Sequence, residues 1–248
     1  GEPGLISRRY QDPAGVAGLI TPWNFPLVSS AWKLAPALAA GCTVVFKPSE
    51  VTPLPEQALA EIALVIGLPP GVFNLVHGDG KHVGAPLTGH PGIDKLSFTG
   101  SNAVGEAVMA AAARGTRNVS LELGGKSPIV VTEDADLDLA CELVLAGFCY
   151  NAGQMCSATS RLLVHQSIAE ALFERLNVAI VELSAGDPQL ATTTLSPLVN
   201  AAQRERVNAY LAIAEEEGLV ATTADAIAMP AQGYFVAPRV FRDVPVTS

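Results

Sequence analysis

The chain has 248 residues, of which 49% are hydrophobic and only 16% charged, and its formal net charge is −9 at pH 7. A chain of this length can bury a large core in one or two domains. The negative net charge argues against nucleic acid or an anionic membrane surface as a partner. No stretch approaches the ~20 apolar residues of a membrane span, and the first residues lack the basic start and apolar run of a signal peptide.

The cysteines and histidines indicate the redox environment and the metal content. The four cysteines show no C-x-x-C spacing, so we expect reduced thiols without disulfides, in an intracellular and cytoplasmic protein. The four histidines show no H-E-x-x-H or comparable spacing, so we expect no metal site.

The first half of the chain alternates short β-rich runs with amphipathic or alanine-rich runs. This alternation predicts an α/β fold with a parallel sheet covered by helices on both faces. The strands are expected at residues 15–20, 43–46, 72–76, 95–98 and 119–121. The helices are expected at residues 27–40, 54–65, 81–87 and 103–114.

A second unit is expected to begin with a strand at residues 127–131. A helix that Asp134 can cap follows this strand and runs to about residue 150. The remaining elements are expected to be strands at residues 161–165 and 234–240 and helices at residues 169–183 and 200–217.

Two loops of the first sheet have the features of a nucleotide site, which is expected at the carboxyl ends of parallel strands. In Lys47-Pro-Ser-Glu50, a glutamate beyond the second strand can accept hydrogen bonds from an adenosine ribose. It would also repel a 2′-phosphate, which makes NADP less favourable than NAD. In Phe98-Thr-Gly-Ser101, Gly100 lets the backbone turn and Ser101 caps a helix whose free N–H groups suit a pyrophosphate.

A third loop is rich in glycine but matches no dinucleotide fingerprint. Gly78-Asp-Gly80 continues to Gly84 with the spacing G-x-G-x-x-x-G, one residue longer than G-x-G-x-x-G. This loop alone does not predict a dinucleotide site.

Three further segments supply the groups that thiol chemistry on a carbonyl requires: a thiol, a carboxylate and an amide donor. Cys156 lies in the loop Asn151-Ala-Gly-Gln-Met-Cys-Ser-Ala-Thr-Ser160. Glu122 stands beside two glycines in Glu122-Leu-Gly-Gly-Lys-Ser127. Asn24 lies in the rigid turn Pro22-Trp-Asn-Phe-Pro26.

These motifs, in this order and over essentially the whole chain, resemble the NAD(P)-dependent aldehyde dehydrogenase superfamily. The resemblance implies a Rossmann-type sheet for the nucleotide and an α/β catalytic domain. It also implies an oligomerisation-type strand at residues 1–13, with Arg8 and Arg9 on or near it. A partial NAD-binding domain would then span residues 14–123, and a partial catalytic domain residues 124–248.

The resemblance also implies roles for individual residues. Cys156 matches the nucleophile and Glu122 the general base. Asn24 matches the residue whose amide forms an oxyanion hole with the backbone N–H of the cysteine, and Lys33 matches a proton-relay lysine. The cofactor positions that match are Trp23, Lys47, Ser49, Glu50, Gly80, Gly84, Gly100, Ser101 and Leu123.

The implied reaction is the NAD-dependent oxidation of an aldehyde to a carboxylic acid through a thiohemiacetal and a thioester on Cys156. The segments around Cys156 and Glu122 look like the betaine-aldehyde and aminoaldehyde branch. Aromatic rings in that branch surround a cationic ammonium group, and Phe25, Trp32 and Tyr150 fall at matching positions. The alternative is that these three rings simply pack the core beside the loop.

Two alternatives to this reaction follow from length and chemistry. Family members are usually about twice this long, so we expect an excerpt of a longer protein. The resemblance also implies a homo-oligomer, either a dimer or a tetramer. The first alternative is a truncated chain that binds nucleotide or a partner without turnover. The second is a CoA-acylating or acyl-phosphate-reducing relative, against which Glu122 speaks, because such relatives need no base to activate water.

Overall fold

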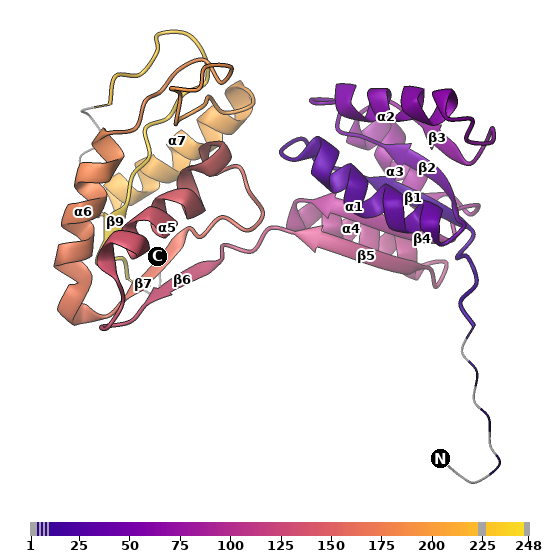
Figure 1. The fold of residues 1–248 in the computed structure, drawn as a ribbon, viewed down its shortest axis with the longest axis horizontal. Coiled ribbons are helices and arrows are strands. Elements are labelled where there is room, and N and C mark those ends of the chain that lie inside the picture. The colour runs from indigo at the N-terminus through magenta and orange to yellow at the C-terminus, as the bar shows by residue number, and fades with distance from the viewer. Residues whose placement is uncertain (1–3, 5, 7, 9, 223–226, 246–248) are drawn as a thin grey trace. The chain divides into compact units, whose positions relative to one another are not determined.

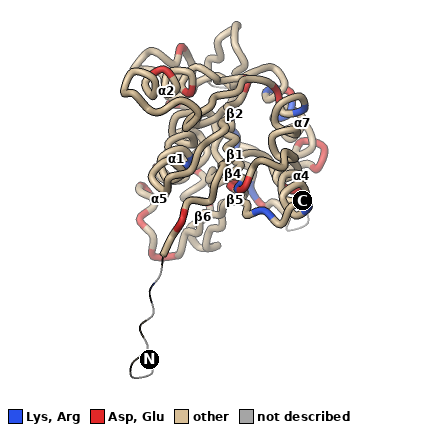
Figure 2. Tube along the Cα trace, turned by 90° about the vertical axis from the view of Figure 1, so that its right-hand side faces the viewer, with Lys and Arg blue, Asp and Glu red and all other residues tan. Residues whose placement is uncertain are grey.

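The computed structural model describes Gly4, Ile6, Arg8, residues 10–222 and residues 227–245 (Figure 1). The chain divides into two compact units, Gly1–Gly124 and Gly125–Ser248. This division lies one residue from the expected boundary between residues 123 and 124. Charged residues are sparse along the trace, and acidic ones outnumber basic ones (Figure 2).

The first unit contains a five-stranded sheet in the order β3-β2-β1-β4-β5, in which every neighbouring pair is parallel. Its strands are β1 (Val16–Ile20), β2 (Thr43–Lys47), β3 (Phe73–Leu75), β4 (Lys95–Gly100) and β5 (Asn118–Leu123). This order is that of the first five strands of a doubly wound nucleotide-binding sheet: one complete half, β3-β2-β1, and two strands, β4 and β5, on the other side of β1. The predicted α/β fold with a parallel sheet is confirmed.

Helices cover both faces of this sheet, whose central strand β1 and its neighbour β2 carry apolar residues on both sides. On one face, Leu19, Val44 and Phe46 pack with α1 and α2, whereas on the other Leu96 and Phe98 pack with α3 and α4. The helices are α1 (Pro26–Ala39), α2 (Leu54–Val65), α3 (Ala85–Gly89) and α4 (Asn102–Ala113).

The helix expected at residues 81–87 is wrong in type over its first part. A π-helical turn, η1 (Gly80–Gly84), precedes α3 there. Asp79 begins this turn by accepting a hydrogen bond from the backbone N–H of His82 (2.6 Å). The spacing of apolar residues does not reveal the wider turn.

The second unit has a smaller sheet and more irregular chain. Its parallel pair β6–β7 packs with α5 and α6 around a core that includes Val131, Val144, Leu172 and Leu176. The elements are β6 (Pro128–Val131), α5 (Leu137–Cys149), η2 (Tyr150–Gly153), β7 (Arg161–Val164), η3 (Gln166–Ile168), α6 (Ala169–Val181), α7 (Ala201–Glu216), β8 (Val220–Ala221) and β9 (Phe241–Arg242).

Two expectations for the second unit are wrong. Asp136, not Asp134, caps α5, because Asp136 Oδ1 accepts from the N–H groups of Asp138 (2.9 Å) and Leu139 (3.1 Å). Asp134 instead accepts a hydrogen bond from Thr132. Residues 234–240 form no strand; the short strand β9 lies directly after them and pairs with β8.

The segment expected to pair across subunits contains no strand among its described residues, and Arg8 is exposed. Arg9 lies outside the described residues. Since pairing across subunits requires a second chain, this expectation stays a prediction. No helix in the described part of the chain is both long enough and apolar enough to span a membrane.

Candidate functional site

Several predicted site residues of the first unit lie along one edge of the sheet. Because the strands are parallel, the carboxyl ends of β1, β2, β4 and β5 lie at the same edge. The Asn24 turn follows β1, and the Lys47 loop follows β2. Gly100 and Ser101 lie at the end of β4, and β5 carries Glu122 and Leu123. The register pairs Glu122 with Thr99, near the ends of β5 and β4.

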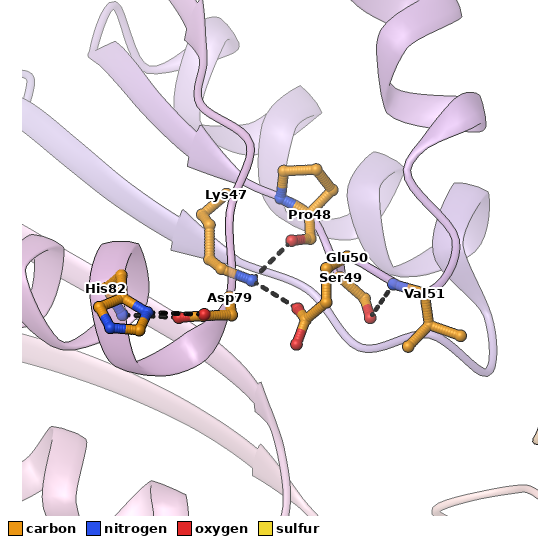
Figure 3. Close-up of polar contacts among 7 residues, drawn as sticks. All are labelled: Lys47, Pro48, Ser49, Glu50, Val51, Asp79 and His82. Carbon is orange, nitrogen blue, oxygen red and sulfur yellow. Dashed lines mark hydrogen bonds and ion pairs between the residues drawn. The ribbon is translucent and has the colours of Figure 1, made fainter. Parts of the chain in front are cut away.

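Lys47 and Glu50 form an ion pair at the end of β2 (Figure 3). Lys47 Nζ lies 3.0 Å from Glu50 Oε2 and donates a second hydrogen bond to the carbonyl of Pro48 (2.8 Å). The lysine side chain is 4% exposed, whereas that of Glu50 is 52% exposed. The lysine is therefore held in place by the protein, and the carboxylate faces solvent where hydroxyl groups of a ligand can reach it.

Ser49 and Thr52 fix the path of this loop. The buried Ser49 accepts a hydrogen bond from the backbone N–H of Val51 (3.2 Å). Thr52 Oγ1 donates to the carbonyl of Trp23 (3.3 Å), which ties the Lys47 loop to the Asn24 turn. Thr52 supports the Lys47 loop, although it belongs to none of the sequence motifs.

The glycine-rich loop lies against the same lysine. A Cβ placed on Gly84 would meet Lys47 Cδ at 3.8 Å, so the π-turn packs along the lysine stem, whereas Gly80 faces open space. Asp79, which begins this turn, also lies 2.7 Å from Nδ1 of His82 (Figure 3). The side-chain hydrogen bond from His82 lowers the pKa of Asp79. No fingerprint spacing in the sequence marks Asp79 or His82.

The loop after β4 has the shape expected of an anion site. A Cβ on Gly100 would lie 2.4 Å from the Phe98 ring, so only glycine fits without a shift of that ring. Ser101 occupies the N-cap position of α4, but its side chain makes no capping hydrogen bond, contrary to expectation. The first N–H groups of α4 are therefore not taken up by that hydroxyl. Leu123 packs closely on α4, where a Cβ on Gly105 would lie 2.7 Å from Leu123 Cδ2.

The Asn24 turn leads directly into α1. Phe25 is the N-cap residue of α1 and Pro26 begins the helix. Trp23, Asn24 and Phe25 are all partly buried. Ser30 Oγ on α1 donates a buried hydrogen bond to Glu56 Oε1 in the first turn of α2 (2.6 Å), which joins the two helices.

Lys33 and Glu122 interact across the polar face of β4 and β5. Lys33, on α1, is buried, and its Nζ donates a hydrogen bond to Ser97 Oγ on β4 (2.9 Å). Burial lowers the pKa of Lys33 to about 8, an effect that the Glu122 carboxylate opposes. Glu122 itself is exposed. A lysine that titrates near neutral pH can exchange a proton with a carboxylate or with water.

Cys156 is the one exposed cysteine, and all four cysteines lie within the described residues and are free. Burial raises the pKa of Cys149 to about 12 and raises that of Cys141 as well. Those two thiols stay protonated and unreactive near neutral pH, and Cys42 is buried.

The loop before Cys156 has an unusual backbone. Asn151 (φ 50°), Ala152 (φ 53°) and Gly153 (φ 75°) are three consecutive left-handed residues. Such a conformation costs roughly 1 kcal/mol or more for a residue with a Cβ, and Ala152 is one. A Cβ on Gly153 would lie 2.8 Å from the carbonyl oxygen of Phe148. The strain must therefore be offset by contacts that hold this turn.

The three predicted substrate aromatics differ in exposure. Phe25 is partly buried, whereas Trp32 on α1 is 73% exposed and Tyr150 at the end of α5 is 61% exposed. Trp32 and Tyr150 are therefore not core residues of their units. Cys156 and Tyr150 belong to the second unit, and the other predicted site residues belong to the first.

Curated relatives cover nearly the whole chain. It is 47% identical over 237 residues to the chloroplastic aminoaldehyde dehydrogenase ALDH10A8 of Arabidopsis thaliana, covering 94% of this chain and 47% of that protein. It is 46% identical over 239 residues to the peroxisomal aminoaldehyde dehydrogenase 2 of Pisum sativum, covering 96% of this chain and 48% of that protein. The chain thus spans about half the length of the curated relatives it matches.

The names of these relatives contradict the cytoplasmic location expected from the sequence. The Arabidopsis protein is chloroplastic and the pea protein peroxisomal. Cysteine spacing reports only that thiols stay reduced, and reduced thiols do not distinguish the cytosol from an organelle. That expectation is therefore withdrawn.

A solved structure and a family model agree with these relatives. A betaine aldehyde dehydrogenase of Staphylococcus aureus, solved with NAD+, superposes with a TM-score of 0.91 at 37% identity, covering 95% of this chain and 47% of that one. The model of the aldehyde dehydrogenase family matches residues 2–248. The chain belongs to the aldehyde dehydrogenase family.

Proposed function

We propose that the protein carrying this chain oxidises an aldehyde to a carboxylic acid with NAD, through a thiohemiacetal and a thioester on Cys156. The observation that carries this proposal is the exposure of Cys156 on a strained loop while the other three cysteines are buried. A reactive cysteine needs access to substrate, whereas structural cysteines are buried and inert.

Each protein group has a chemical task in this proposal. The Cys156 thiolate attacks the aldehyde carbon, and the Asn24 amide, together with the backbone N–H of Cys156, stabilises the oxyanion. After oxidation leaves a thioester, Glu122 removes a proton from the water that attacks it, which releases the acid and restores the thiolate. Lys33 lies close enough to influence Glu122 electrostatically, and it can pass that proton onward to solvent.

The residues of the first unit fit NAD. We assign the adenosine ribose to Lys47 and Glu50, because the carboxylate is half exposed beside a fixed ammonium group. Trp23, Ser49, Gly80, Gly84 and Leu123 would complete this binding surface. The first turn of α4, with Gly100 and Ser101, would take the pyrophosphate. The chemistry that bound NAD supplies is the acceptance of two electrons and a proton as a hydride equivalent.

The cofactor preference follows from charge. A 2′-phosphate on the ribose would meet the Glu50 carboxylate, so NAD should bind more tightly than NADP. The Lys47 ammonium offsets part of this repulsion, but it is only 4% exposed, whereas the Glu50 carboxylate is 52% exposed to an incoming phosphate.

We further propose that the substrate is a betaine-type or amino aldehyde. The relatives named above and the structural neighbour act, by their names, on aldehydes of this kind. Phe25, Trp32 and Tyr150 supply rings that can attract an ammonium group, and two of them are exposed. Residues 1–13 would pair across subunits in a homodimer or homotetramer.

A turnover assay tests this function. Purified protein with betaine aldehyde and NAD should produce NADH and the acid, and Cys156→Ser should abolish both. Glu122→Gln should still form the thioester but release acid slowly. NAD binding without turnover in the unaltered protein would instead favour a non-catalytic role, and thioester transfer to CoA in preference to water would favour the acylating alternative.

A further inference from the structure

The side chain of Gln154 makes two hydrogen bonds, one within the Cys156 loop and one from this loop to another segment of the same unit. Gln154 Nε2 donates a hydrogen bond to the carbonyl of Asn151 (2.9 Å). Its Oε1 accepts one from the backbone N–H of Val199 (2.9 Å). The side chain thus connects the turn before Cys156 with a segment 45 residues further along the chain.

The first of these contacts closes the left-handed turn. The carbonyl of Asn151 accepts from the Gln154 side chain and also from the Gln154 backbone N–H (3.1 Å). Two donors on one carbonyl fix the orientation of the peptide between Asn151 and Ala152. That peptide joins two left-handed residues, whose conformation is costly unless the surroundings enforce it.

The second contact fixes the turn to a rigid neighbour. Val199 follows the buried Leu198, whose backbone N–H donates to the carbonyl of Tyr234 (2.9 Å). The segment that receives Gln154 is therefore itself anchored by core packing and by a backbone hydrogen bond. The Cys156 loop therefore cannot shift without breaking its contact to this anchored segment.

We propose that Gln154 is a positioning residue that aims Cys156. The carboxamide is suited to this task because it offers a donor and an acceptor on one planar group, and the two contacts use one of each. Gln154 lies two residues before the cysteine, so a change in its backbone orientation moves the sulfur directly. This inference rests on the nucleophilic role proposed for Cys156.

The test compares Gln154→Met, which keeps the length of the side chain without its hydrogen bonds, with Gln154→Glu, which keeps the acceptor for Val199. Gln189→Met is the matched control, because Gln189 is an exposed glutamine of the same unit. Three quantities are measured on each purified protein: kcat and KM for aldehyde oxidation, the rate of Cys156 alkylation by iodoacetamide, and hydrogen exchange at the Val199 amide.

We expect Gln154→Met to lower kcat by roughly 10- to 100-fold, because a small misplacement of a reacting group has effects of that size. The KM for NAD should stay unchanged. Alkylation should change far less than kcat, since a small reagent attacks from any accessible direction. The Val199 amide should exchange faster in Gln154→Met but stay protected in Gln154→Glu. Gln189→Met should match the wild type in all three measurements.

Two results from Gln154→Met would overturn the inference. The first is a wild-type kcat in Gln154→Met while Cys156→Ser is inactive, which leaves the proposed function intact and removes only the role of Gln154. The second is an equal loss of kcat and alkylation, which indicates a collapsed loop and a purely structural residue. If Gln154→Met does not fold, wild-type activity in Gln154→Glu despite the lost Asn151 contact would likewise refute it. Activity that survives Cys156→Ser would instead refute the proposed function itself.

Discussion

The two units carry their proposed site residues in different ways. In the first unit, most of these residues lie at or just after the carboxyl ends of parallel strands, and the loops between strand and helix are short. In the second, Cys156 lies on a loop with three consecutive left-handed residues, held by the Gln154 side chain and by packing on α5. A regular sheet positions cofactor ligands through its topology, whereas the nucleophile lies on an irregular loop whose position depends on side-chain contacts such as those of Gln154.

The largest expected effect is a loss of aldehyde oxidation without a loss of NAD binding, because we assign these two tasks to different units. Cys156→Ser should lower aldehyde oxidation by roughly three orders of magnitude or more, since the hydroxyl is a far poorer nucleophile. NAD affinity, which we assign to the first unit, should stay unchanged. Steady-state kinetics and calorimetric titration with NAD measure the two effects. A parallel loss of NAD affinity would contradict the division of roles between the units.

The packing of the Cys156 loop on α5 should be sensitive to one added methyl group. A Cβ on Gly147 would lie 1.8 Å from Thr159 Oγ1, while Thr159 also donates its backbone N–H to the Gly147 carbonyl (2.9 Å). Gly147→Ala should therefore lower the free energy of unfolding by about 1–3 kcal/mol and reduce turnover.

The control for this variant lies in the first unit. Gly89 ends α3, and a Cβ added to it would meet nothing within 4 Å, so Gly89→Ala should be nearly neutral. Denaturant unfolding of both variants measures the difference. Equal stabilities would show that the loop accommodates the methyl group by moving away from α5.

The buried lysine of the first unit predicts a pH effect on stability. The pKa of Lys33 is about 8 in the folded protein and 10.5 without perturbation. Between these values the unfolded chain binds more protons than the folded one, so the Lys33 contribution to stability rises with pH. Allowing for partial solvent screening, the rise is on the order of 1–2 kcal/mol.

Lys33→Met is the variant that isolates this contribution. The difference in unfolding free energy between wild type and variant should move in favour of wild type as pH rises from about 8 towards 10.5. The raised pKa of Cys149 acts in the opposite direction, but it does so in both proteins and cancels. A difference that stays constant with pH would show that Lys33 titrates normally.

The smallest effect concerns the start of α5. Asp136→Ala should cost about 1 kcal/mol of stability, the usual value for a lost N-cap, because Asp136 accepts from two backbone N–H groups. Asp134→Ala removes an exposed contact with Thr132 and should cost less. Thermal unfolding of the pair decides which aspartate caps the helix, and the reverse order would contradict the observed cap.

The first unit is more predictable from the sequence than the second, because its strands and helices alternate regularly. The expected bounds of α2 agree with the structure, and each of the five expected strands begins and ends within two residues of the observed strand. Apolar periodicity and the turns between elements report directly on such a sheet. The α/β class and the family follow from the same residues.

The second unit was less predictable for specific physical reasons. Asp134 and Asp136 are equally good caps by composition, and only hydrogen-bond geometry distinguishes them. Residues 234–240 look strand-like, but Pro238 among them has no N–H to pair. Ala152 gives no sign of a left-handed backbone, because its conformation is imposed by the surrounding fold. Gln154 lies in the Cys156 loop motif, but the sequence does not indicate its hydrogen bonds to Asn151 and Val199.

The most direct test of the account is the mass of the Cys156 peptide after single-turnover reaction of Glu122→Gln with an aldehyde and NAD. The account predicts an acyl adduct on Cys156, formed together with NADH and lost slowly, while Cys42, Cys141 and Cys149 stay unmodified. NADH formation without an adduct on Cys156, or with an adduct on another cysteine, would contradict it.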